Sequence, residues 1–276
     1  MRLALNTIVA EPHRWVPDKS LARPIEETLE VVARAGYGAA EVWQHHLTNR
    51  DPRETAAFAE RAKALGVRVV AVGGYPMPYA SGDEREEEIK RVDRLMNDCE
   101  VFGASIFKLF IGRIGSDSLT PEQRELSIGF LKDLADRAAD RGITLTAETH
   151  AKTLVDSVGA CETLVSELGA PNFKLCYQPF NPLDTKAALA DFDALRSHIV
   201  HLHLQAKDEN GFCLMKDASL DHNAFLRHVK ASGFDGLLCV EYVKGSAPRD
   251  LAEFSDDEVA EAAEEDREFV QSIWNE

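Results

Sequence analysis

Short apolar runs alternate with longer amphipathic stretches along the whole chain. The short runs have the length and composition of strands, and the longer stretches repeat apolar residues at helical spacing. We expect strands at residues 3–7, 39–44, 67–72, 105–111, 144–149, 173–178, 199–205 and 237–242. We expect helices at residues 25–35, 52–65, 84–102, 121–141, 153–168, 185–196, 221–232 and 256–274. Alternation of this kind is typical of parallel βαβ units.

The order of these elements favours a closed barrel over an open sheet. Four of the expected helices end just before a glycine (Gly36, Gly66, Gly142 and Gly233), where a left-handed cap leads into the next strand. An open doubly wound sheet that binds a dinucleotide would carry a glycine-rich loop after its first strand, and residues 6–9 contain no glycine. The sequence therefore predicts an α/β fold, a (β/α)₈ TIM barrel, as a single domain over residues 1–276.

The acidic segment from Phe254 to Glu265 allows two interpretations. Dense like charge often marks a disordered interaction tail. The apolar residues Val259, Ala263, Phe269, Val270 and Trp274 recur at roughly helical spacing, however, and Ser255 ahead of Glu258 forms a capping-box pattern. We therefore predict a final helix.

Composition and charge narrow the functional classes. A net charge of -16 argues against a nucleic-acid partner, because phosphate binding depends on clustered Lys and Arg. Five cysteines without CxxC spacing suggest neither a disulfide framework nor a zinc knuckle, and a reducing cytoplasm fits them best. No long hydrophobic run is present, so we expect neither a signal peptide nor a membrane partner.

Polar residues at the ends of the last four expected strands are the candidates for chemistry, since barrel active sites lie where strands end. Strand alternation directs Glu148 and His150 inward, and it does the same for the set His201, His203 and Gln205. It also directs Gln178, Cys239 and Glu241 into the barrel. Any one of these residues alone could be a satisfied polar group, but four consecutive strands ending in one are hard to attribute to packing.

Two carboxylates and an imidazole form a mixed oxygen and nitrogen shell. Such a shell suits Mn²⁺, Co²⁺, Fe²⁺ or Zn²⁺ better than Ca²⁺. Burying Glu148 and Glu241 together without a cation would be costly. We therefore expect a divalent metal ion as cofactor, and Mn²⁺, Co²⁺, Zn²⁺ and Mg²⁺ remain open.

The motifs AETH, YQPFN, HLHLQAKD and VEY, in this order, resemble the xylose-isomerase-like TIM-barrel superfamily of sugar phosphate isomerases and epimerases. The family includes ketose 3-epimerases and hydroxypyruvate isomerases. The resemblance implies metal ligands at Glu148, Gln178, His203 and Glu241. The epimerases of the family carry Asp-x-x-His where this chain has Gln178 and Asn181, so an amide replaces a charged ligand. A Gln carbonyl oxygen can still coordinate a hard cation.

The resemblance also implies a reaction: proton transfer at the carbon next to a carbonyl through an enediolate, with Glu148 and Glu241 as acid and base. The substrate would be a small, sugar-like molecule. Residues at or near strand ends that are candidates to bind it are Asn6, Glu41, Trp43, His45, Lys108, His150, Asn181 and Gln205.

Each of these candidates also has a structural interpretation. Glu41 and Lys108 could form an ion pair inside the barrel, which is as good an explanation as substrate binding. Trp43 could be an apolar wall of the pocket. His45 and His46 are adjacent, so they should point to opposite faces of their strand.

Several functions remain open from the sequence. The leading hypothesis is a sugar isomerase or epimerase, and the runner-up is a lyase that dehydrates a cyclic polyol derivative of the dehydroshikimate or inosose kind. A non-catalytic barrel that lost tight metal binding through Gln178 is a further alternative. An abasic-site endonuclease shares the fold, but the -16 charge opposes a DNA-binding face. A homo-oligomer is neither indicated nor excluded.

Overall fold

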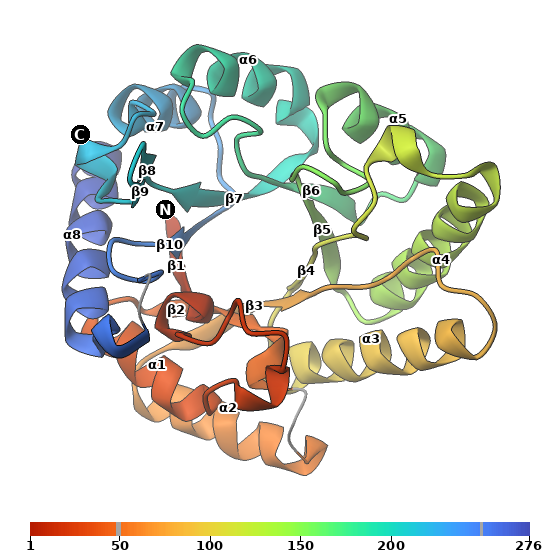
Figure 1. Ribbon diagram of the computed structural model, residues 1–276, viewed down its shortest axis with the longest axis horizontal. Helices are drawn as coiled ribbons and strands as arrows, with labels where there is room; N and C mark the ends of the chain where they lie inside the picture. Colours follow the sequence, from red (N-terminus) through yellow and green to blue (C-terminus); the bar gives the residue numbers. More distant parts are fainter. Residues whose placement is uncertain (48–50, 249–250) are drawn as a thin grey trace.

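The computed structural model describes residues 1–47, 51–248 and 251–276. Parallel strands close into a barrel in the order β1-β10-β7-β6-β5-β4-β3-β2, with helices around it (Figure 1). The barrel strands are β1 (Arg2–Asn6), β2 (Ala39–Trp43), β3 (Arg68–Gly74), β4 (Ile106–Leu109), β5 (Thr144–Glu148), β6 (Phe173–Tyr177), β7 (Ile199–Gln205) and β10 (Leu237–Tyr242). The predicted (β/α)₈ barrel is therefore confirmed.

The described residues form eight α-helices, one after each barrel strand. They are α1 (Ile25–Arg34), α2 (Thr55–Ala64), α3 (Gly82–Phe102), α4 (Pro121–Asp140), α5 (Val158–Leu168), α6 (Thr185–Leu195), α7 (His222–Ala231) and α8 (Asp256–Asn275). The four glycines expected to end helices all have positive φ, from 68° at Gly142 to 79° at Gly233. None of the described helices has the length and apolar character needed to cross a membrane.

Two expected helices begin later than the sequence suggests. The stretch expected from residue 153 becomes helical only at Val158, because the Thr153 hydroxyl donates to the carbonyl of His150 and accepts from the amide of Val155. Ser157 then caps the helix by accepting from the amide of Ala160. The stretch expected from residue 52 starts with a 3₁₀ turn, Pro52–Glu54, ahead of α2.

The acidic C-terminal segment is helical, as predicted. The Ser255 hydroxyl accepts from the amide of Glu258 at the start of α8, and Val259, Ala263 and Val270 are buried in the core. Aspartate and glutamate in the first turn also suit the positive end of the helix dipole.

Strand alternation divides the barrel into an outer and an inner layer. Outward residues such as Leu145, Leu202 and Val240 pack against the helices, where burial of each side chain is worth roughly 1.5–3 kcal/mol. The inner layer is made of small and apolar residues at its lower end: Ala4, Ala39, Ala71, Ile106, Leu237 and Cys239. The polar inner residues lie above them, toward the strand C-termini.

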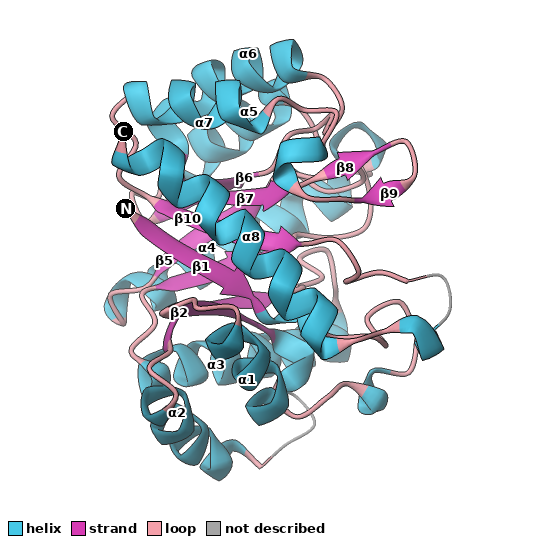
Figure 2. Cartoon of the chain, turned by 90° about the vertical axis from the view of Figure 1, so that its left-hand side faces the viewer, coloured by secondary structure: helices cyan, strands magenta, loops and turns pink. Residues whose placement is uncertain are grey.

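A short antiparallel hairpin, β8 (Lys207–Asp208) and β9 (Gly211–Phe212), follows β7 and was not predicted. Its turn forms because the Asp208 carboxylate accepts from the amides of Asn210 and Gly211. In Figure 2 the hairpin lies at the end of the barrel toward which the strand arrows point, and the chain termini lie at the opposite end.

Candidate active site

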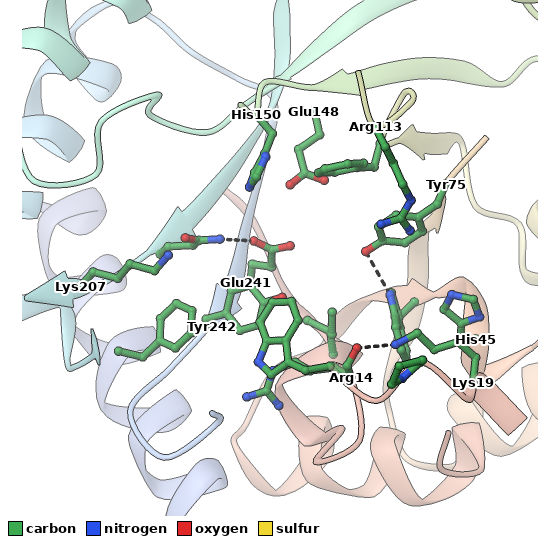
Figure 3. A pocket seen from close by; sticks show the side chains of 17 residues that line it. Arg14, Lys19, His45, Tyr75, Arg113, Glu148, His150, Lys207, Glu241 and Tyr242 are labelled. Atoms are coloured by element: carbon green, nitrogen blue, oxygen red, sulfur yellow. Dashed lines mark hydrogen bonds between the residues drawn. The ribbon is translucent and has the colours of Figure 1, made fainter. Parts of the chain in front are cut away.

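A cavity of about 580 Å³ opens at the C-terminal end of the barrel (Figure 3). This volume falls within the range of small-molecule sites. Its lining combines the ends of several strands with the loops that follow them: Ile8, Arg14, Trp15, Pro17, Lys19, Trp43, His45, Tyr75, Phe110, Arg113, Glu148, His150, Gln205, Lys207, Phe212, Glu241 and Tyr242.

Glu148 and Glu241 line this cavity, and the buried His203 lies against both of them. One candidate ligand atom from each of the three lies within 4.8 Å of the others. Nδ1 of His203 is 3.8 Å from Oε1 of Glu148 and 3.5 Å from Oε2 of Glu241. The three side chains come from β5, β7 and β10, and alternation along each strand turns them inward.

His203 presents a buried nitrogen that no described residue satisfies. Its Nε2 lies 3.2 Å from Oε2 of Glu41, and a carboxylate only accepts, so Nε2 carries the hydrogen. In the neutral ring Nδ1 then holds a lone pair, and Nδ1 has no hydrogen-bond partner among the described residues although it is buried. A lone pair that faces two carboxylates is the arrangement a divalent cation requires. These residues therefore fit a metal ion.

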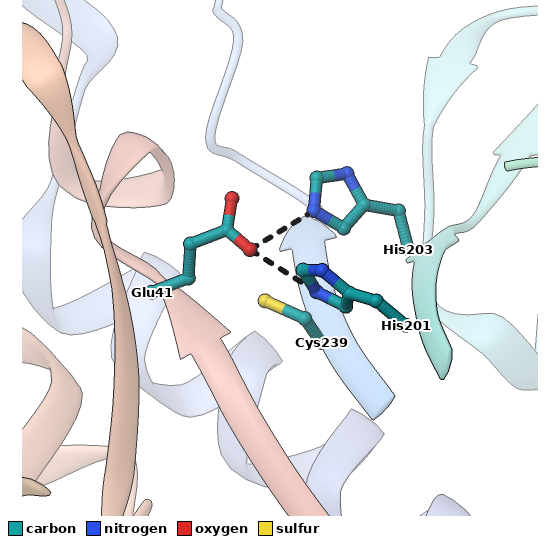
Figure 4. A group of neighbouring side chains, drawn as sticks. All are labelled: Glu41, His201, His203 and Cys239. Atoms are coloured by element: carbon teal, nitrogen blue, oxygen red, sulfur yellow. Dashed lines mark hydrogen bonds and ion pairs between the residues drawn. The ribbon is translucent and has the colours of Figure 1, made fainter. Parts of the chain in front are cut away.

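Glu41 supports this arrangement from deeper in the barrel. Its Oε2 is 3.1 Å from Nε2 of His201 and 3.2 Å from Nε2 of His203, and the Sγ of Cys239 lies in the same cluster (Figure 4). Burial raises the pKa of Glu41, but the two imidazoles lower it well below its ordinary value. Glu41 is thus a buried carboxylate that orients His203 toward the cavity.

Lys108 places a positive charge beside the carboxylates of Glu148 and Glu41. Its ammonium donates to Oε2 of Glu148 at 2.6 Å and lies 3.8 Å from Oε1 of Glu41. Burial lowers the pKa of Lys108, but Glu148, Tyr75 and Glu41 raise it well above the ordinary value, so it is charged. The predicted ion pair of Glu41 and Lys108 is present, and the shorter contact is with Glu148.

Gln178 and Gln205 form a bridge on the other side of the site. Nε2 of Gln205 donates to Oε1 of Gln178 at 2.9 Å and to Oε2 of Glu241 at 2.5 Å. Burial raises the pKa of Glu241, but His203, Lys108 and this amide lower it below its ordinary value. The oxygen of Gln178 is therefore connected to Glu241 through the amide of Gln205. Gln178 itself is buried and is not among the residues that line the cavity.

The other predicted substrate residues divide into three groups. Trp43, His45 and His150 line the cavity. Asn6 lies below it, where its amide donates to Oε1 of Glu41 at 2.9 Å. Asn181 is exposed and outside the lining, because its side chain accepts from the amide of Leu183 and closes a local turn.

His45 and His46 point in different directions, although they lie in a 3₁₀ turn, Gln44–His46, and not on the strand as the expectation assumed. His45 lines the cavity, whereas His46 is buried with Nδ1 2.9 Å from the Thr7 hydroxyl and Nε2 3.2 Å from Oε2 of Glu11. Burial raises the pKa of Glu11, but His46 and two backbone amides lower it below its ordinary value.

Sequence reasoning missed most of the cavity wall, which consists of aromatic and cationic loop residues. Trp15 and Phe212 both stack on Tyr242, with ring centroids 6.2 and 4.5 Å away. The only sequence signal for these wall residues was their position along the chain. Lys207 follows the strand that carries His203, and Tyr242 ends the strand that carries Glu241.

Comparison with known proteins places the chain in a family. A family model described as xylose isomerase-like TIM barrel matches residues 29–273. The chain belongs to this family. The resemblance seen in the sequence motifs is therefore confirmed.

Individual relatives of this family are distant in sequence. A 3-dehydroshikimate dehydratase of Bacillus anthracis is 21% identical over 174 residues, which cover 62% of this chain and 62% of that protein. The crystal structure of the probable 3-DHS dehydratase AsbF from Bacillus anthracis is similar with a TM-score of 0.76, at 16% identity over 98% of this chain and 99% of the other. A D-psicose 3-epimerase crystallised with D-fructose also has a TM-score of 0.76, at 14% identity over the full length of both chains. At this identity the two structures support the fold.

Proposed function

We propose that the protein is a metal-dependent isomerase or epimerase of a sugar or sugar derivative. The observation that carries the proposal is the unsatisfied Nδ1 of His203 between the carboxylates of Glu148 and Glu241, beside a cavity that accommodates a small molecule. The family membership and the likeness in fold to a ketose epimerase support it.

The metal would be held by Glu148, His203 and Glu241, with Mn²⁺, Co²⁺, Zn²⁺ or Mg²⁺ as candidates. When bound it would polarise the substrate carbonyl and stabilise the charge of the enediolate. Gln178 would act through Gln205, whose amide holds the Glu241 carboxylate in place.

The two carboxylates have the surroundings that proton transfer requires. Glu241 is buried yet kept ionised by His203 and Lys108, which suits it to accept a proton from the carbon next to the carbonyl. Glu148 accepts a hydrogen bond from the ammonium of Lys108 and faces the same space from another strand, so Lys108 would pass it the proton that Glu148 returns to the intermediate, while the proton taken by Glu241 leaves to solvent. Trp43 and Tyr75, joined by a 3.0 Å hydrogen bond, help to cover this part of the cavity.

Deuterium exchange tests the proposal. The purified protein would be incubated in D₂O with a ketose panel and each candidate metal, and deuterium at the carbon next to the carbonyl would be followed by NMR. We expect metal-dependent exchange that Glu148→Gln and Glu241→Gln each slow by about a hundredfold or more. The exposed substitution Lys132→Gln on α4 is the matched control. Wild-type protein that binds metal but exchanges no ketose would refute the isomerase proposal.

A dehydratase is the second candidate. The sequence match to a dehydroshikimate dehydratase favours it, and the largely aromatic wall of the cavity suits a planar cyclic product. The same protein and metals would be offered 3-dehydroshikimate, and loss of water would be followed by ultraviolet absorbance. Dehydration without ketose exchange would assign the site to the lyase reaction.

A further inference from the structure

The mouth of the cavity is cationic, although the chain is strongly acidic. Asp and Glu outnumber Lys and Arg by 47 to 31 in the whole sequence. The cavity lining reverses this ratio, with the four cations Arg14, Lys19, Arg113 and Lys207 against the two carboxylates Glu148 and Glu241. Glu148 is already paired with Lys108, so the mouth carries a surplus of positive charge.

Arg113 and Lys207 lack an acidic partner among the described residues, whereas Arg14 and Lys19 both donate to backbone carbonyls. Within residues 1–47, 51–248 and 251–276, no carboxylate forms an ion pair with the side chain of Arg113 or Lys207. The Lys207 ammonium instead lies 4.7 Å from the ring centre of Phe212. Other cations on the same molecule find acids readily, as Arg23 does with Asp256 at 2.6 Å. The charges of Arg113 and Lys207 are thus left available to a ligand.

Arg113 and Lys19, together with the neutral His45, form one cationic wall, and Figure 3 draws Lys207 on the other side of the cavity. Burial lowers the pKa of Lys19, and the nearby Arg113 lowers it further although Glu11 opposes the change. Burial also lowers the pKa of His45 to about 4, with Lys19 and Arg113 contributing. Like charges that lie close enough to repel one another are stabilised when an anion binds between them.

His45 adds a neutral donor to this wall. The Oε1 of Gln44 accepts from the amide of Tyr75 and from the guanidinium of Arg91, which fixes the orientation of the Gln44 side chain. Its Nε2 therefore donates to Nε2 of His45 at 3.1 Å. The neutral imidazole then carries its hydrogen on Nδ1, which is a donor suited to an oxyanion.

We propose that the substrate carries an anionic group, a carboxylate or a phosphate, which Arg113 and His45 bind beside the charge of Lys19 while its carbonyl end reaches Glu148 and Glu241. This rests on the proposed function of the same site and narrows it to sugar acids, acidic cyclic polyols or sugar phosphates. The cationic wall would hold one end of the substrate, and the rings of Tyr75 and Phe110 between them would cover its carbon skeleton.

Binding measured without turnover tests this inference separately from the reaction. Two of the three tryptophans, Trp15 and Trp43, line the cavity, so intrinsic fluorescence reports a bound ligand. The probes are D-fructose, its terminal phosphate ester and the keto acid of the same chain length, with calorimetry as the second readout. We expect at least one of the two anions to bind about tenfold more tightly than D-fructose, as charge-assisted hydrogen bonds would provide. The preferred anion distinguishes phosphate from carboxylate.

Substitutions then locate the anion. Arg113→Gln should remove most of the preference for the anion, lowering the affinity for the anion much more than the affinity for D-fructose, because it deletes a charge at the mouth. Lys63→Gln on α2, exposed and remote from the cavity lining, is the matched control and should change neither affinity. Equal affinity for the neutral and charged probes, including no binding by any of them, would overturn the proposal. Loss of the preference in Lys207→Gln but not in Arg113→Gln would overturn the placement on this wall.

Discussion

His203 uses its two ring nitrogens for different purposes. Nε2 is committed to Glu41, and Nδ1 faces Glu148 and Glu241. Burial lowers the pKa of His203, but Cys176 and the carboxylates of Glu41 and Glu241 raise it well above the ordinary value. The ring therefore holds a proton on Nδ1 in the metal-free protein, and the Nδ1 lone pair would become available when a metal ion displaces that proton.

Glu41→Gln tests whether the buried carboxylate positions His203. We expect metal affinity to fall about 10- to 100-fold, because an amide no longer fixes the hydrogen on Nε2. Calorimetric titration with Mn²⁺ measures the change. His201→Gln is the control, since His201 contacts Glu41 but not the Glu148 and Glu241 pair. Equal losses in the two variants would show that general disruption, not orientation, is responsible.

Lys108→Met tests the role of the buried ammonium. Removing it leaves the buried Glu148 carboxylate without its partner, so we expect the metal-free protein to lose about 3–5 kcal/mol of unfolding free energy. Added Mn²⁺ should restore much of that loss, because it supplies positive charge at the same carboxylate. Urea unfolding with and without the metal measures both quantities. A loss that is undiminished by metal would mean that Lys108 serves only the packing of the barrel.

Gln178→Glu tests the residue at which the chain departs from its family pattern. Glu has the length of Gln, so its carboxylate can still accept from Gln205 while adding a negative charge near the cation. We expect metal to bind about tenfold more tightly, which corresponds to about 1.4 kcal/mol. Metal titration of both proteins decides the point. Unchanged metal affinity would show that the charge of residue 178 does not stabilise the bound metal.

Secondary-structure elements explain why some of the site was predictable. The period of two along β5, β7 and β10 assigns Glu148, His203 and Glu241 to the barrel interior, and parallel strands bring their C-terminal ends to one side. The bridge from Gln178 through Gln205 depends on side-chain conformations, which periodicity does not determine. Neither does it determine that Arg113 and Lys19, from separate loops, line the same cavity.

Loops were the least predictable elements for the same reason. The start of α5 depends on hydrogen bonds of Thr153 and Ser157, and the β8–β9 hairpin depends on a turn closed by Asp208. Such local side-chain bonds compete with regular structure and leave little trace in apolar spacing. The wall of the cavity is built from such loops, so its aromatic character was missed.

Helix α8 contains a buried acid that makes stability depend on pH. Oδ1 of Asp266 accepts from the amide of Met215, whereas Oδ2 has no partner among the described residues. Burial raises the pKa of Asp266 from 3.8 to about 7. The folded state therefore holds a proton that the unfolded state releases, and stability should decrease as pH rises from about 4 through about 7.

Asp266→Asn should remove this dependence. The asparagine side chain keeps an oxygen for the amide of Met215 and cannot ionise. The unfolding free energy of the variant therefore increases relative to that of wild type as pH rises. We expect the difference in unfolding free energy between the two proteins to change by roughly 2–4 kcal/mol between about pH 4 and about pH 8. Urea unfolding at several pH values measures it. Parallel pH profiles would show that Asp266 ionises normally in the fold.

At the scale of the whole molecule, the candidate ligands join strands that are far apart in the sequence. Glu148 and Glu241 are separated by more than ninety positions, and His203 lies between them. Metal binding requires all three strands in place, so it should stabilise the barrel as a unit. Metal at about a hundred times its dissociation constant should add roughly 2.7 kcal/mol and raise the melting temperature. Thermal unfolding with and without Mn²⁺ tests this, and a Glu148→Gln/Glu241→Gln double variant should show no such shift.

The different positions of the proton-transfer residues and the cavity-wall residues, on strands and on loops respectively, have a consequence for directed evolution. The residues proposed to move protons belong to hydrogen-bonded strands, whereas Arg113, Phe212 and Trp15 stand on connecting segments of the same barrel. Randomising those three positions alters what enters the cavity without disturbing the register of β5, β7 or β10. Selection for new substrates should therefore recover active variants from libraries confined to these three loop positions. Libraries at the strand ends should mostly yield inactive proteins.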